Sequence, residues 1–179
     1  MTERAHQPTP PLKRPLWRRW GVEVLIFLCG VLALQMWQLR DAARGPAPDF
    51  ALNDLAGQQV TLADWRKLQP EKPRLLYFWA EWCPVCRTTA GSVSAIAADW
   101  PVLSVAVQSG SESAVAKVMQ EKGYSWPTIN DPRGQMLQRY GLPGTPAFAI
   151  LTPDGQIRHV AVGYTSEIGL RLRLWLAGL

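Results

Sequence analysis

Residues 75–80 form an unbroken apolar run, Leu-Leu-Tyr-Phe-Trp-Ala, in which no polar residue alternates with the apolar ones. Such a run predicts a strand buried on both faces. It leads into Cys83-Pro84-Val85-Cys86, after which residues 88–100 place apolar side chains at helical spacing. The pattern therefore predicts a strand, a Cys-x-x-Cys turn and a helix whose N-terminus lies at Cys83.

Similar patterns continue on both sides of this unit. Residues 102–107 predict a second buried strand, and the hairpin turn Pro153-Asp154-Gly155 joins two further apolar runs. Ser109 to Glu112 have the spacing of a capping box at the start of a helix. We also expect strands over residues 49–52, 59–62, 126–129, 147–152 and 157–162, and helices over residues 113–122, 133–140 and 165–177. This order predicts an α/β fold with a mixed central sheet and helices on both faces.

The N-terminal part of the chain has a different pattern. Residues 20–39 are mainly apolar with tryptophans near both ends, which predicts one N-terminal transmembrane helix. Residues 1–19 are basic and rich in proline, typical of a disordered cytoplasmic tail, and residues 40–48 resemble a linker before a domain over residues 49–179. A cleaved signal peptide and a buried helix are the alternatives, but Arg40-Asp41 follows where a cleavage site would lie.

The charge of the chain is concentrated in that tail. The 179 residues carry a formal charge of +5, yet residues 1–20 hold five Lys or Arg against one acid. Residues 40–179 hold fourteen against twelve. This nearly balanced domain does not predict a nucleic-acid partner. By the positive-inside rule the tail is cytoplasmic, and the domain lies outside the inner membrane, in the periplasm, where disulfides persist.

The Cys83–Cys86 pair admits several kinds of chemistry. A helix N-terminus favours a thiolate at Cys83, and Cys86 is close enough to close a disulfide. Zinc would need four ligands, whereas the chain has one other cysteine and two histidines; haem attachment would need a histidine where Arg87 stands. A purely structural disulfide at this spacing would constrain the unfolded chain only weakly. We therefore predict a redox pair in which Cys83 is the exposed nucleophile.

The segment from Phe78 to Cys86 resembles the active-site motif of the thioredoxin superfamily. The likeness covers residues 46–179 and is greatest to membrane-anchored TlpA/ResA/CcmG-like proteins and to ScsD-type proteins associated with suppression of copper sensitivity. It implies a thioredoxin-like fold. It also implies that Thr145-Pro146 is a cis-proline loop that binds substrate together with Trp82 and Pro84.

Three positions depart from family patterns. Tyr77 stands where many thioredoxins have a buried carboxylate, which leaves Glu81 as the nearby candidate for proton transfer. Gly91 replaces a helix-kinking proline. Val85 cannot donate a hydrogen bond to the sulfur of Cys83, as a histidine could.

These observations predict a membrane-tethered periplasmic thiol–disulfide oxidoreductase that acts on protein disulfides through mixed disulfides. The cysteines carry the electrons, so we expect no cofactor and no metal. The family resemblance and Val85 favour a reductase supplied by a membrane electron donor, whereas Pro84 favours a disulfide-forming oxidase. A copper-handling protein using Cys83 and Cys86 as ligands is a further alternative. A thiol peroxidase lacks support, because no isolated candidate cysteine occurs in the domain.

Overall fold

Strand β4 (Arg74–Trp79) lies in the middle of the sheet, and every residue of it is buried. It pairs in parallel with β5 (Val102–Val107) and antiparallel with β7 (Ala147–Leu151). Both neighbours are also buried along their whole length. The absence of hydrophobic alternation therefore predicted burial on both faces correctly.

The sheet has six strands in the order β1-β8-β7-β4-β5-β6. Strand β6 (Thr128–Asp131) extends the parallel part, whereas β8 (Gln156–Val162) and the short β1 (Gly45–Pro46) pair antiparallel on the other side. A separate hairpin joins β2 (Ala51–Asn53) and β3 (Gln59–Thr61). The sheet is mixed, as predicted.

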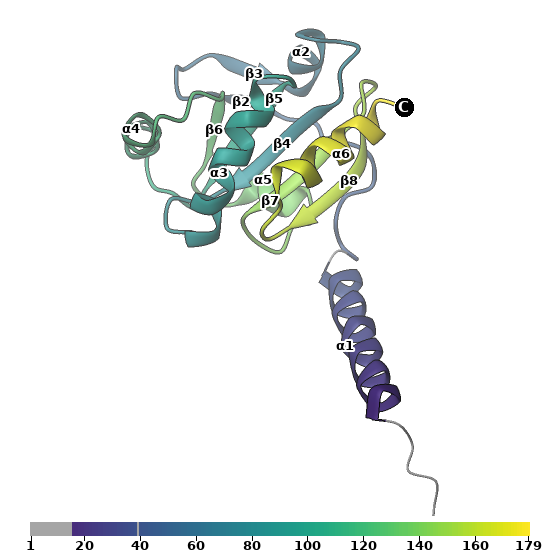
Figure 1. Cartoon of the computed structure of the whole chain (residues 1–179). Helices are drawn as coiled ribbons and strands as arrows, with labels where there is room; N and C mark the ends of the chain where they lie inside the picture. The colour runs from purple at the N-terminus through teal and green to yellow at the C-terminus, as the bar shows by residue number, and fades with distance from the viewer. Residues whose placement is uncertain (1–15, 39) are drawn as a thin grey trace, which may run out of the picture. The chain divides into compact units, whose positions relative to one another are not determined.

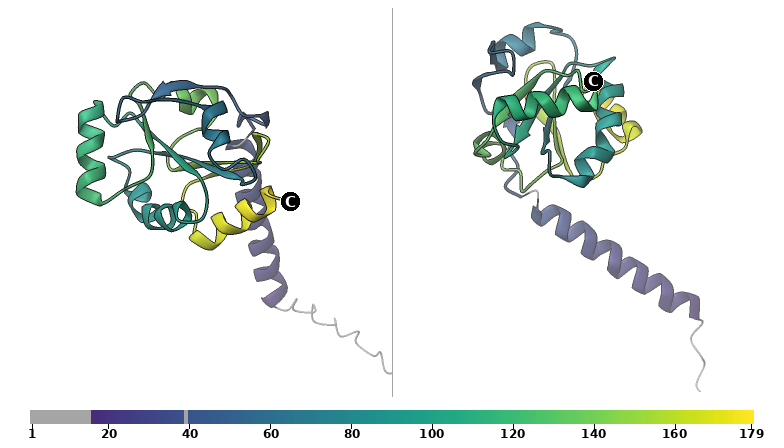
Figure 2. Two further views of the ribbon diagram at one scale, coloured as in Figure 1. Left: turned by 90° about the horizontal axis from the view of Figure 1, so that it is seen from above. Right: turned by 90° about the vertical axis from the view of Figure 1, so that its left-hand side faces the viewer.

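Helices cover both faces of the sheet. Helices α3 (Pro84–Ala97), α4 (Glu112–Lys122) and α6 (Glu167–Ala177) contribute to one core, and α2 (Leu62–Lys67) and α5 (Gln135–Arg139) contribute to the other. In Figure 1 α3 and α6 lie side by side in front of the strands. The left view of Figure 2 places these two helices below the strands and α5 above them.

The predicted capping box is wrong in one respect. Ser111, not Ser109, is the N-cap of α4, and its hydroxyl accepts a hydrogen bond from the backbone of Ala114. Gly110 has a positive φ of 90°, which separates Ser109 from the helix and leaves it at the end of β5. Ser109 instead contributes to the site described below.

The computed structural model describes residues 16–38 and 40–179, which belong to two compact units, Met1–Gln38 and Leu39–Leu179. The first unit contains helix α1 (Leu16–Gln38), which begins four residues before the predicted span at residue 20. Most of the predicted cytoplasmic tail, residues 1–15, lies outside the described residues. Within the described ranges, no helix combines the length and the apolar character needed to cross a membrane.

Residues 40–48, predicted as a linker, belong to the second unit. Gly45 and Pro46 pair with Ile157 and Gln156 of β8, and the side chains of Ala42 and Ala47 are buried. The proline and glycine content suggested a linker, but it also suits a short edge strand, where a missing N–H is tolerated.

Candidate active site

Cys83 is the N-cap residue of α3, and Pro84 follows as the first helical residue. Its sulfur accepts a hydrogen bond from the backbone N–H of Cys86 at 3.2 Å. Proline suits this position because its fixed φ matches the helix and the first N–H groups have no partner within the helix. The sequence prediction that Cys83 lies at a helix N-terminus is confirmed.

The two cysteine sulfurs are joined in a disulfide, with the Cα atoms 5.3 Å apart. In this oxidised state Cys83 is 4% exposed and Cys86 is 2% exposed, so the predicted exposure of Cys83 is not found. The loop at Thr145 covers the first sulfur, whose distance to the Thr145 carbonyl oxygen is 3.6 Å. A disulfide sulfur carries no proton, so this contact becomes a hydrogen bond only in the reduced thiol.

The loop opposite the disulfide contains a cis peptide bond between Thr145 and Pro146, as the family resemblance implied. Pro146 is buried, and its carbonyl oxygen accepts a hydrogen bond from the N–H of Gly163 at 2.8 Å. This bond fastens the loop to the end of β8. The structure thus brings residues that are 62 positions apart in sequence into contact across the Cys83–Thr145 pair.

The turn before Cys83 is held by residues that sequence reasoning missed. The backbone N–H of Glu81 donates to the hydroxyl of Ser109 at 3.0 Å, and this hydroxyl donates to the carbonyl of Val107. The indole N–H of Trp82 donates to the carbonyl of Gln108 at 3.0 Å, while its side chain stays 61% exposed. A signal was available, because the carboxyl ends of parallel strands β4 and β5 meet at one edge of the sheet.

Tyr77 lies behind the second cysteine. Its hydroxyl is 3.3 Å from the Cys86 carbonyl oxygen and 3.2 Å from the hydroxyl of Thr89, and its ring stacks on Phe148. Burial raises the pKa of Tyr77 well above its ordinary value. The phenol therefore stays protonated near neutral pH and cannot replace a buried carboxylate as a proton acceptor.

A cavity of about 180 Å³ adjoins Cys86 and is also lined by Tyr77, Glu81, Glu121 and Tyr124. Glu81 is exposed, so the cavity brings a solvated carboxylate to the same space as the buried second cysteine. A water molecule needs both room and polar partners, and this space offers both. The arrangement is compatible with proton exchange between Cys86 and Glu81 through water.

Candidate metal ligands do not gather around the pair. Within residues 16–38 and 40–179, no three or more His, Cys, Asp and Glu side chains lie close enough together to hold a metal ion. Cys29, the third cysteine, is in α1 and carries a free thiol. The geometry thus offers two sulfurs at a helix N-terminus, a cis-proline loop across from them and an exposed aromatic rim, which is an arrangement suited to thiol–disulfide exchange.

Comparison with known proteins assigns the chain to a protein family. Residues 43–160, well over half of the chain, match the model of the AhpC/TSA family. The chain belongs to this family. It is 37% identical over 129 residues to a thioredoxin-like protein of Haemophilus influenzae, covering 72% of this chain and 75% of that protein.

Two further relatives carry names that describe their chemistry. The chain is 27% identical over 165 residues to the thiol-disulfide oxidoreductase ResA of Bacillus subtilis, covering 87% of this chain and 89% of ResA. It also resembles the crystal structure of a secreted Mycobacterium tuberculosis disulfide oxidoreductase homologous to E. coli DsbE. That match has 26% identity and a TM-score of 0.60 and covers 71% of this chain and 95% of the other. The thioredoxin-like fold is thereby confirmed, while the narrower ScsD-type resemblance stays a prediction.

Proposed function

We propose that the chain is a thiol–disulfide oxidoreductase that acts on protein disulfides through Cys83 and Cys86. The observation that carries this proposal is the disulfide at the N-terminus of α3, with the Cys83 sulfur facing the Thr145 carbonyl. A helix N-terminus stabilises a thiolate through its unpaired N–H groups and dipole. Membership of the AhpC/TSA family and the likeness to named thiol–disulfide oxidoreductases support the same chemistry.

In the reducing direction the Cys83 thiolate attacks one sulfur of a substrate disulfide. A mixed disulfide forms, and the second substrate sulfur leaves as a thiolate that takes up a proton. Cys86 then loses its proton and attacks Cys83, which releases the first substrate sulfur as a thiol. Two electrons pass from the dithiol to the substrate, and the enzyme ends as the disulfide.

The surface around Cys83 supports a protein substrate. Trp82 and Val85 are 61% and 41% exposed on either side of the buried sulfur, and Pro84 is exposed between the cysteines. Thr145 and Pro146 lie across from them, so an extended peptide could pair with the backbone of the loop while its side chains contact the apolar rim. We assign substrate binding to Trp82, Pro84, Thr145 and Pro146, and proton transfer to Glu81.

A membrane tether is the second part of the proposal. Helix α1 exposes apolar side chains on all sides, including Ile26 and Phe27, which would gain from removal from water. With the basic residues that precede it, this helix would hold the domain on the periplasmic side of the inner membrane. Density-gradient flotation of the full chain with phospholipid vesicles tests this part, and failure to float would contradict it.

The third part concerns direction, for which we propose reduction with electrons from a membrane donor. Val85 provides no side-chain donor to the Cys83 thiolate, and a less stabilised thiolate lowers the reduction potential by about 30 mV per 1.4 kcal/mol. Acid quenching of cells followed by thiol alkylation should find the Cys83–Cys86 pair mostly reduced. A pair found mostly as disulfide in cells with an intact electron supply would make this an oxidase.

The exchange itself is tested by trapping. A Cys86→Ser variant retains the attacking thiol but lacks the resolving one, so it should accumulate covalent complexes with its substrates. A Cys83→Ser variant is the matched control and should accumulate none. Equal trapping by both variants, or by neither, would refute the assignment.

A further inference from the structure

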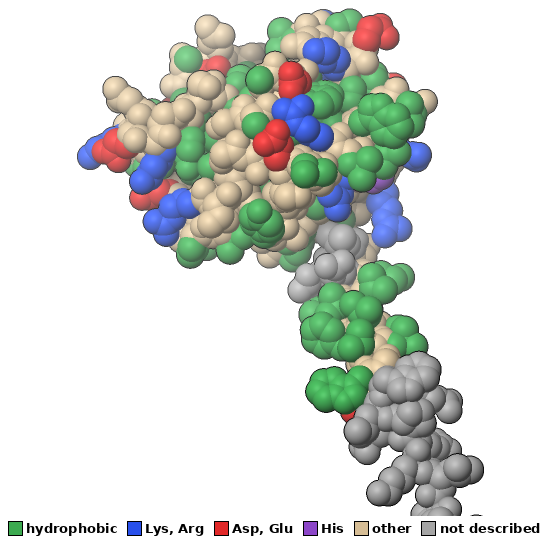
Figure 3. Space-filling view, in the orientation of Figure 1, with side chains coloured by type: hydrophobic (Ala, Val, Ile, Leu, Met, Phe, Trp, Pro, Cys, Tyr) green, Lys and Arg blue, Asp and Glu red, His purple; other side chains and the backbone are tan. Residues whose placement is uncertain are grey.

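Helix α6 carries a second apolar face that is largely exposed in the described domain. Its inner face, Leu170, Leu174 and Ala177, is buried against the sheet. Four large apolar residues of α6 follow helical spacing on the opposite side, Leu179 comes two residues after the helix ends, and the five are 37–86% exposed: Ile168, Leu172, Trp175, Leu176 and Leu179. We refer to these five as the outer stripe. Figure 3 shows hydrophobic side chains gathered over α6.

Single exposed apolar residues are ordinary on protein surfaces, but a contiguous stripe marks a surface that meets another apolar partner. The stripe follows α6 from Ile168 onward, and none of its residues lines the cavity at Cys86. The substrate rim at Trp82 and Val85 therefore does not account for it.

Positive charge accompanies the outer stripe. Arg173 of α6 and Arg158 of β8 both lower the pKa of His159, after the larger effect of burial, so each guanidinium group lies near this imidazole. Arg44, with Arg158 and His159, lines a cavity beside β8. Among the described residues, none of these three arginines forms an ion pair with an acid.

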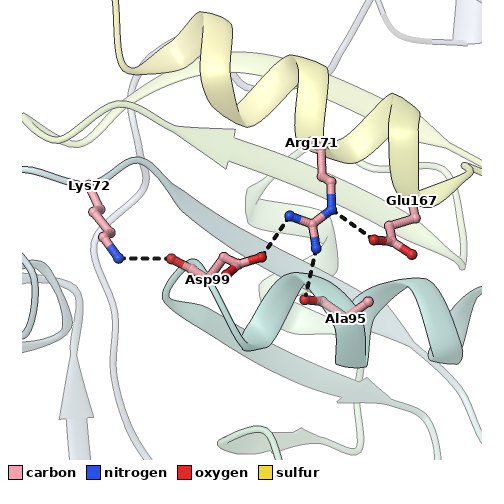
Figure 4. A network of polar contacts seen from close by, with 5 residues as sticks. All are labelled: Lys72, Ala95, Asp99, Glu167 and Arg171. Carbon is pink, nitrogen blue, oxygen red and sulfur yellow. Dashed lines mark hydrogen bonds and ion pairs between the residues drawn. The ribbon is translucent and has the colours of Figure 1, made fainter.

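Two acidic groups close to α6, Glu167 and Asp99, are already paired. Arg171 bonds Glu167 at 2.8 Å and Asp99 at 2.6 Å, and it also donates to the carbonyl of Ala95, as Figure 4 shows. The network joins α6 to the end of α3. It leaves Arg173 of α6, and Arg44 and Arg158 at the cavity beside β8, without an ion-pair partner among the described residues.

We infer that the outer stripe of α6 docks on an anionic lipid surface, with its apolar side chains in the boundary between headgroups and acyl chains. A helix with Leu, Ile and Trp on one face and arginines at its flanks has the composition of an interfacial helix. A second copy of the chain would bring the same arginines to the same stripe. Phosphate headgroups instead supply the negative charge that this surface lacks.

The path of the chain supports a lipid surface as the occupant. Residues 42–46 run along β8, the strand that carries Arg158, and only residues 39–41 separate Ala42 from the end of α1. An extended stretch of that length reaches at most about 14 Å. This step rests on the proposed membrane tether, because a tether that ends at Gln38 keeps this edge of the domain close to the bilayer.

The test uses the full chain in vesicles of phosphatidylcholine, with or without phosphatidylglycerol, that contain a phospholipid with a photoactivatable acyl chain. After irradiation, labelled peptides are identified by mass spectrometry. We expect label on α1 and on the peptide that contains residues 168–179. The label on this peptide should be greater in vesicles with phosphatidylglycerol than in vesicles without it. In a Leu172→Ser/Trp175→Ser variant the α6 label should fall about tenfold while the α1 label is retained. A tenfold fall corresponds to a loss of about 1.4 kcal/mol of apolar burial in the lipid.

Leu68→Ser is the matched control, because Leu68 is 72% exposed at the end of α2 and lies outside the stripe. It should leave the α6 label unchanged. Label on α1 without label on α6 would overturn the docking inference and leave the tether intact. No flotation and no label on either helix would overturn both. Crosslinks between α6 helices of two copies would show that a second copy occupies the stripe, which also overturns the inference.

Discussion

At the residue scale, the difference between the two cysteines follows from their places in α3. The Cys83 sulfur lies at the helix N-cap and accepts the N–H of Cys86, whereas Cys86 lies within the first turn, next to Tyr77. A charge-assisted hydrogen bond and the helix dipole both favour the Cys83 thiolate.

We therefore predict that Cys83 has a thiol pKa below the free value of about 8.5. In reduced Cys86→Ser protein, Cys83 should be alkylated faster at neutral pH than Cys86 is in reduced Cys83→Ser protein. The measurement is the alkylation rate of each variant against pH. Faster labelling of Cys86 near neutral pH would reverse the assignment of the nucleophile.

The second prediction at the residue scale concerns Glu81. A Glu81→Gln variant retains the backbone bond to Ser109 but loses the carboxylate at the Cys86 cavity. The rate of insulin reduction should fall about tenfold at neutral pH, which is less than the roughly 100-fold or greater rate increase that general-base catalysis typically contributes. Because hydroxide can replace the base, the two proteins should converge as pH rises. Glu121→Gln, which changes another carboxylate of the same cavity, is the matched control and should remain near the wild-type rate; equal losses would contradict a specific role for Glu81.

At the scale of elements, the segment before β1 is packed closely against the end of α5. Gly141 has a φ of +60°, and a Cβ added there would lie 1.8 Å from the carbonyl oxygen of Asp41. Ala43 also donates its N–H to the carbonyl of Tyr140 at 2.9 Å. Residues 41–43 thus need a glycine at position 141.

Gly141→Ala should lower the free energy of unfolding by roughly 3 kcal/mol or more, through backbone strain and displacement of this segment. Gly144→Ala is a matched control in the same loop, because nothing lies within 4 Å of its added Cβ and its φ is not positive. It should change stability by less than about 0.5 kcal/mol. Urea denaturation followed by fluorescence measures both, and equal effects would show that the contact with Asp41 is unimportant.

At the scale of the whole molecule, the redox site and its supporting contacts lie entirely within the unit Leu39–Leu179. The core residues of both faces of the sheet also belong to it. The fold of this unit and its chemistry should therefore be independent of α1.

We predict that a protein consisting of residues 39–179 folds and reduces insulin as fast as the full chain does. A shorter protein of residues 47–179 lacks β1 and the contact of Ala42, and it should unfold at lower urea concentration. Circular dichroism and the insulin assay distinguish folding from activity. A protein of residues 39–179 that folds but does not reduce insulin would contradict this prediction.

The sequence alone determined the parts of this protein that depend on local chemistry. The apolar run of β4 has no alternation, so it specified a strand buried on both faces, and the Cys83-Pro84 pair specified the start of α3. The turn Pro153-Asp154-Gly155 likewise located the β7–β8 hairpin, because proline fixes φ and glycine permits the positive φ found at Gly155. The cis-proline loop came from family resemblance rather than from any local rule.

Only the tertiary structure decided which distant groups meet. Ser109 looked like a helix cap, yet the parallel pairing of β4 and β5 brings it to Glu81. The burial of Cys83 depends on Thr145 across the site, and the pairing of residues 45–46 with β8 turns a predicted linker into an edge strand. The exposure of the outer stripe of α6 was likewise decided by the tertiary structure. Periodicity indicates that a helix has an apolar face. Only the packing shows that Leu170 and Leu174 are buried against the sheet while Leu172 and Trp175 stay exposed.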